Sequence, residues 1–124
     1  MKLTRIFLTF ASALALSVTP ALAYGFTPVK SFQGELDTGY SLKHYVTLYA
    51  GYDYRVEGWC DKDCTDMDLE LYDMYGNLAL SDHGDSDVPS LNFQVNTTGE
   101  FILKVSMYDC AWEPCSYNVQ VSER

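Results

Sequence analysis

The sequence predicts an all-β protein, an antiparallel and jelly-roll-like β-sandwich of about seven to eight strands that follows a cleaved signal peptide. Three observations lead to this prediction. Short runs of alternating apolar and polar residues recur along the chain, and turn-forming residues separate them about every eight to twelve positions. Beyond the N-terminal segment, no run has the period of a helix.

The N-terminal segment, residues 1–23, has the three parts of a secretory signal peptide. Lys2 and Arg5 form a positive start, residues 6–18 are apolar, and Ala21 and Ala23 flank a small-x-small cleavage site. The apolar run is shorter than the roughly 20 residues that span a bilayer. We therefore expect a secreted protein, extracellular or periplasmic, with no membrane span and one mature domain over residues 24–124.

The first half of the mature chain is expected to hold an irregular lead-in and three strands. Gly25 and Pro28 make residues 24–30 the lead-in. The next three segments alternate in hydrophobicity, and Ala50 and Gly51 form a turn before the third. The expected strands are residues 31–36, as an edge strand, then 40–49 and 52–59.

The central stretch, residues 59–87, predicts a hairpin with an acidic loop on each side. In residues 67–72, Met67, Leu69 and Leu71 alternate with Asp68 and Glu70. A turn at residues 75–77 leads into a short strand over residues 78–81. After the loop at residues 82–89, alternation continues in three further strands, which are centred on residues 91–95, 101–107 and 117–121.

Short connections imply that each strand reverses the direction of the last. The loops at residues 60–66, 82–89 and 109–116 therefore lie at one end of the sandwich, and the turns at Gly51, Gly76 and Gly99 lie at the other. The first end gathers eight acidic residues, namely Asp61, Asp63, Asp66, Asp82, Asp85, Asp87, Asp109 and Glu113. Carboxylates so close together repel one another unless water or a cation intervenes.

This acidic end is a candidate calcium site. Calcium prefers carboxylate and carbonyl oxygens, which acidic loops with glycine provide. The predicted ligands are Asp61, Asp63, Asp66, Asp82, Asp85 and Asp87. No EF-hand spacing is present. The alternative is a solvated acidic surface that binds no specific ion.

All four cysteines follow the signal peptide, and an even number in an exported chain predicts two disulfides. Each sequential pair brackets one loop, so we predict Cys60–Cys64 and Cys110–Cys115. Because both loops lie at one end, the crossed pairs Cys60–Cys110 or Cys64–Cys115 stay open. Zinc is disfavoured, since no paired C-x2-C occurs and the histidines lie far from the cysteines in sequence.

The charge of the mature chain excludes some partners. It has 17 acidic residues and six of the eight basic ones, a net charge of about −11 with histidine neutral. Such a chain repels phosphate backbones and anionic membranes. We therefore expect neither nucleic acid nor a membrane surface as a partner.

An enzyme needs a nucleophile, a base and a group that orients the base. His83, in an acidic loop, is the better candidate base, because His44 lies on an alternating strand as a core or edge residue. Asp66 and Asp68 resemble a glycosidase pair, but a domain of this size leaves little room for a cleft. No G-x-S-x-G or H-E-x-x-H motif is present. We expect no catalytic residues, with a small secreted hydrolase as the least favoured alternative.

Several motifs between Tyr45 and Val121 resemble the bacterial pre-peptidase C-terminal domain. They are D-M-D-L-E-L-Y-D at residues 66–73 with Gly76 and Asn77, the acidic loop 81–87, T-G-E-F-I-L-K-V at 98–105 and Y-N-V-Q-V at 117–121. The usual member of that family has no such cysteine pairs and accompanies a peptidase, which this chain lacks. The resemblance implies a secreted β-sandwich ancillary to extracellular proteins, and some members bind calcium or an extracellular polymer.

The resulting functional prediction is a secreted, non-catalytic module for binding or assembly, with an extracellular protein or polysaccharide as partner. Tyr45, Tyr49 and Tyr72 fall opposite the expected core residues and predict an exposed aromatic face. The first alternative is a calcium-dependent binding module that the acidic loops stabilise.

Overall fold

The computed structural model describes residues 25–124, so the predicted signal peptide and its cleavage site lie outside the described residues. This part of the chain forms eight β-strands and no helix. The strands are β1 (Thr27–Leu36), β2 (Ser41–Leu48), β3 (Asp53–Cys60), β4 (Cys64–Tyr72), β5 (Leu78–Asp82), β6 (Ser90–Gln94), β7 (Gly99–Cys110) and β8 (Cys115–Glu123). Within residues 25–124, no helix is long and apolar enough to cross a membrane.

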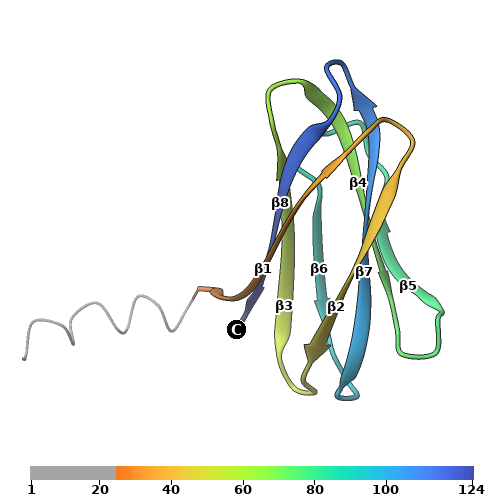
Figure 1. The fold of residues 1–124 in the computed structure, drawn as a ribbon. Coiled ribbons are helices and arrows are strands. Elements are labelled where there is room, and N and C mark those ends of the chain that lie inside the picture. Colours follow the sequence, from red (N-terminus) through yellow and green to blue (C-terminus); the bar gives the residue numbers. More distant parts are fainter. Residues whose placement is uncertain (1–24) are drawn as a thin grey trace, which may run out of the picture.

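The strands form two antiparallel sheets that face each other (Figure 1). Sheet A has the order β1-β8-β3-β6 and sheet B has the order β2-β7-β4-β5. Successive strands alternate between the sheets except at the β4–β5 hairpin, which is the arrangement of an eight-stranded jelly roll. The predicted all-β sandwich is confirmed.

The prediction for the start of the domain was wrong. Residues 27–30 belong to β1, which pairs with β8 from Thr27 onward, and only a register shift between Pro28 and Lys30 interrupts the pairing. Proline is tolerated there because β1 is an edge strand with one neighbour. Likewise β4 begins at Cys64 rather than Met67, because Cys64 lies opposite Cys110 of β7. Local turn signals cannot reveal such long-range pairing.

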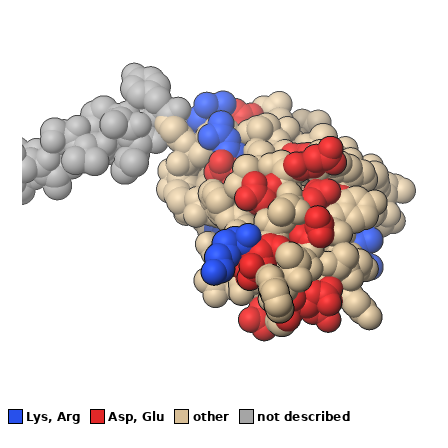
Figure 2. All heavy atoms as spheres, turned by 90° about the horizontal axis from the view of Figure 1, so that it is seen from above, with Lys and Arg blue, Asp and Glu red and all other residues tan. Residues whose placement is uncertain are grey.

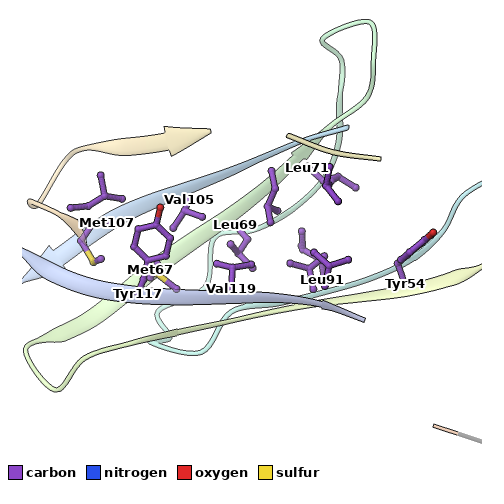
Figure 3. Packing of buried hydrophobic residues seen from close by; sticks show 14 of the residues in the cluster. Tyr54, Met67, Leu69, Leu71, Leu91, Val105, Met107, Tyr117 and Val119 are labelled. Carbon is purple, nitrogen blue, oxygen red and sulfur yellow. The ribbon is translucent and has the colours of Figure 1, made fainter. Parts of the chain in front are cut away.

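The core lies between the sheets and consists of the inward residues of each strand (Figure 3). Leu69 and Val119, one from each sheet, are fully buried. The largest buried side chains include Tyr117, whose ring lies against Gly34 of β1. A Cβ at Gly34 would lie 2.6 Å from the Tyr117 hydroxyl oxygen, so this position requires glycine.

The disulfides are the local ones, Cys60–Cys64 and Cys110–Cys115, each with a Cα–Cα distance of 5.9 Å. They close the β3–β4 and β7–β8 connections. The crossed alternatives are excluded, although Cys64 and Cys110 are register partners on neighbouring strands. Two disulfides are typical of proteins of an oxidising, extracellular compartment.

The predicted gathering of loops is also confirmed. At the disulfide end, the Met67 amide donates to the Ser86 carbonyl at 3.0 Å, and the Ala111 amide donates to the Asp63 carbonyl at 2.8 Å. At the opposite end, the Gly51 amide donates to the Val95 carbonyl at 3.0 Å. The three acidic loops therefore share one end of the sandwich.

Candidate functional site

A groove of about 650 Å³ opens on the side of the sandwich, between the edge strands of the two sheets. Its walls come from β1, β2, the β2–β3 turn and the end of β8. The lining residues are Val29, Lys30, Tyr45, Val46, Thr47, Tyr49, Tyr52 and Glu123. This volume lies in the range of about 300–1,000 Å³ that small-molecule sites occupy.

Aromatic side chains dominate the rim of this groove. Tyr45, Tyr49 and Tyr52 are 55%, 52% and 43% exposed, whereas Val46 is buried. The Tyr49 amide donates to the Tyr54 hydroxyl at 2.9 Å, which fixes the start of the β2–β3 turn to the core. The groove thus presents apolar ring faces with hydroxyl groups on a supported backbone.

The predicted aromatic face is divided. Tyr45 and Tyr49 line the groove, but Tyr72 does not: it lies on the outer face of sheet B, where its hydroxyl donates to Glu70 at 3.0 Å. Tyr52 lines the groove but was not predicted to do so, because residue 52 was expected to begin the strand 52–59. It lies in the turn just before β3, where the alternation of the strand no longer applies.

The two edges that flank the groove differ. β1 carries the register shift at Val29, a common way of blunting an edge strand. β2 pairs with β7 in unbroken register from Ser41 to Leu48 and has no other strand beside it in the described chain. Its outer edge is therefore a regular row of backbone donors and acceptors.

At the acidic end, two of the predicted calcium ligands accept hydrogen bonds from backbone amides. Asp61 accepts from the amides of Asp63 and Ser116 at 3.0 and 2.9 Å. Asp82 accepts from the amides of Gly84 and Ser90 at 3.0 and 2.9 Å. All four oxygens of these two carboxylates thus have backbone partners. The bonds from Asp63 and Gly84, each two residues beyond the aspartate, are typical of aspartate in turns, whereas those from Ser116 and Ser90 join different parts of the chain.

The other four predicted ligands are Asp63, Asp66, Asp85 and Asp87, and among them Asp66 has a buried Oδ1 atom with no hydrogen-bond partner in residues 25–124. Burial raises the pKa of Asp66, and repulsion from Asp85, Asp109 and Asp82 raises it further. Figure 2 looks onto this end and shows acidic side chains in several separate groups. Among residues 25–124, no three histidine, cysteine or acidic side chains are placed to hold a metal ion. Calcium binding stays a prediction.

A third feature lies on the outer face of sheet B, a cavity of about 390 Å³ over β2, β7 and β4. One wall is an ionic cluster around Glu70, which His83 Nε2 contacts at 2.9 Å and Lys104 Nζ at 3.7 Å. Burial alone would raise the pKa of Glu70, but hydrogen bonds from Tyr72 and His83 and the charge of Lys104 lower it below its usual value. His83 thus pairs with a strand residue rather than with the acidic residues of its own loop.

Asp68 also lines this cavity. It is 5% exposed, and its Oδ1 has no hydrogen-bond partner in the described part of the chain. Burial raises the pKa of the Asp68 carboxyl, and repulsion from Asp66 adds to the effect. Alternation assigns Asp68 to the outer face correctly, but it cannot reveal that neighbouring elements cover that face.

His44 has a structural contact, as the sequence suggested. Its Nε2 lies 2.7 Å from the Tyr117 hydroxyl, and its ring stacks on Phe32 with 4.5 Å between centroids. Burial lowers its pKa and so favours the neutral ring. This histidine orders the inner side of β2.

The chain matches no protein-family model and no curated protein. The resemblance to the pre-peptidase C-terminal domain therefore stays a prediction.

Proposed function

We propose that the mature chain is a secreted, non-catalytic module that binds an extended peptide segment of an extracellular protein along the outer edge of β2. The observation that carries this proposal is the combination of a regular edge strand with a tyrosine-lined groove beside it.

The edge provides the backbone part of recognition. A peptide that adds to a sheet forms main-chain hydrogen bonds with the edge strand, and these supply affinity that is largely independent of sequence. β2 is eight residues long, contains no proline and pairs without a bulge. These are the properties that favour addition of another strand.

The groove provides the side-chain part. Successive side chains of an added strand point to opposite faces, so every second residue of the peptide would contact the groove. Tyr45, Tyr49 and Tyr52 offer rigid contact area at little cost in side-chain entropy. The acidic surface favours peptides that carry lysine or arginine beside their apolar residues.

The proposal is tested by selecting binders to the mature protein from a phage-displayed library of random peptides of about ten residues, a strand's length. We expect alternating apolar sequences, and binding should shift the amide resonances of β2. The Tyr49→Ala variant should bind about tenfold more weakly, a loss of about 1.4 kcal/mol. Tyr75→Ala is the matched control, since Tyr75 is 80% exposed in the β4–β5 turn.

Two results would overturn the proposal. One is a library that yields no peptide whose binding shifts β2. The other is binding of a neutral oligosaccharide such as cellohexaose in the groove, with no competition by selected peptides. The latter result would assign the groove to a polysaccharide partner.

Cation binding is a second candidate, supported by the buried Oδ1 atom of Asp66, which has no hydrogen-bond partner in residues 25–124. At about a hundred times its dissociation constant, calcium would stabilise the fold by roughly 2.7 kcal/mol. The test is thermal unfolding in millimolar calcium against sodium chloride of matched ionic strength. Superimposable curves would show that calcium only screens the charges of the acidic end, as sodium does, and has no specific site there.

A further inference from the structure

The cavity on the outer face of sheet B has a row of polar side chains at its base. Ser41, Ser106 and Asp68 are register neighbours on β2, β7 and β4, respectively. The Ser41 and Ser106 hydroxyl oxygens lie 2.8 Å apart. All three residues line the cavity, so it combines one carboxylate with two hydroxyl groups.

The negative charge of the Asp68 carboxylate is not fully compensated by its neighbours. A buried carboxylate is costly unless an opposite charge or hydrogen-bond donors compensate it. The closest ion-pair contacts of His83 and Lys104 are with Glu70 rather than with Asp68. Besides burial, Asp66, Asp82 and Glu70 repel the Asp68 carboxylate and raise its pKa, and the charge of His83 offsets part of this effect.

The chemistry of the base fits an organic cation better than a metal ion. An alkylammonium group has three N–H donors, and the Asp68 carboxylate and the two serine hydroxyls, which belong to the cavity lining, are acceptors. Calcium needs six to eight oxygens, and no three acidic, histidine or cysteine side chains in residues 25–124 are placed for a metal. Tyr108 lines the cavity and is 62% exposed, so its ring is accessible to a cation at the rim.

We propose that this cavity binds an alkylammonium group, with Asp68 as its counter-ion. The ammonium comes either from a free amine or from a lysine side chain of a partner protein, which present the same chemistry. The cavity shares no lining residue with the groove beside β2, so the proposal is independent of the peptide-binding function.

The test is a titration followed by the amide resonances of Ser41 and Ser106. The probes are n-butylammonium chloride for the free amine and acetyl-lysine methylamide for the side chain, each against sodium chloride of equal ionic strength. We expect saturable shifts with at least one probe. 1-Butanol, which has the same alkyl chain without the charge, should bind at least tenfold more weakly.

Two variants separate the specific site from the general acidity of the surface. Asp68→Asn should weaken ammonium binding at least tenfold, whereas Asp85→Asn, which removes a charge elsewhere at the acidic end, should leave it within twofold. Ser106→Val keeps every charge and fills part of the cavity, so it should also abolish binding. Thermal unfolding of each variant checks that it folds.

The proposal is overturned if neither amine shifts these resonances in a saturable way, or if butanol binds as well as the amine. It is also overturned if calcium saturates the site and Asp68→Asn abolishes that binding, since the cavity would then be a metal site. Equal weakening by Asp68→Asn and Asp85→Asn would show a diffuse charge effect instead.

Discussion

Replacement of Asp61 by alanine tests whether the acidic end is held by hydrogen bonds or prepared for a cation. One Asp61 oxygen accepts from the Asp63 amide within the β3–β4 connection. The other accepts from the Ser116 amide at the start of β8. A single carboxylate therefore fastens the two disulfide-closed loops to each other.

The expected loss follows from these two bonds. Hydrogen bonds to a charged group contribute about 1.5–3 kcal/mol each, and the Ser116 bond is exposed, so its share is at the lower end. We expect Asp61→Ala to lower the free energy of unfolding by about 3–4 kcal/mol. For a domain of about 100 residues this lowers the melting temperature by roughly 10 °C or more. Asp61→Asn, which keeps one acceptor oxygen, should lose about half as much.

The assay is thermal and urea unfolding of the mature protein with intact disulfides, followed by far-ultraviolet circular dichroism. Asp63→Ala is the control, since it removes the same charge from the same loop and leaves its backbone amide bound to Asp61. Each measurement is made in chelator and in millimolar calcium. A loss within about 0.5 kcal/mol of the control would refute the structural role of Asp61. A loss that appears only with calcium would make Asp61 a metal ligand.

Three further predictions concern the core and the buried carboxylate. Leu69→Ala should lower the free energy of unfolding by about 3–5 kcal/mol, measured in urea, because Leu69 is fully buried between the sheets. Gly34→Ala should cost about 1–3 kcal/mol in the same assay, because its Cβ would collide with the buried Tyr117 ring, and a neutral result would show that β1 moves freely. The raised pKa of Asp68 means that the folded state binds its proton more tightly than the unfolded chain. The free energy of unfolding should therefore fall as pH rises from about 4 through that raised pKa. At pH 7 the Asp68→Asn variant should be more stable than the wild type. Identical pH profiles of wild type and variant would show that the charged form of Asp68 does not destabilise the fold.

The sequence alone determined most of the fold. Residues such as Leu69 and Leu71 alternate with polar neighbours, and this period of two is a local property that a half-buried strand requires. The short connections then fixed strand direction, and strand direction placed the acidic loops together. The sequence also favoured the local disulfides, because Cys60 and Cys64 bracket one turn, but only the structure excluded the crossed pairs.

Tertiary structure decided which groups meet. In the sequence, Asp61 and Asp82 are loop residues with no evident hydrogen-bond partner. In the structure, Asp61 accepts a hydrogen bond from the Ser116 amide and Asp82 accepts one from the Ser90 amide, and both donors lie outside the aspartate's own turn. His83 contacts Glu70 because the β4–β5 hairpin brings the end of β5 back beside β4.

The two candidate sites also depend on contacts that the sequence does not reveal. The groove exists because β1 and β2 are the edge strands of two different sheets and lie on the same side of the sandwich. The burial of Asp68 depends on the residues that surround β4. Alternation specifies which face a side chain occupies, since that depends on the strand itself. What covers the face, and which strand has no neighbour, depends on pairings between distant segments, which only the folded chain settles.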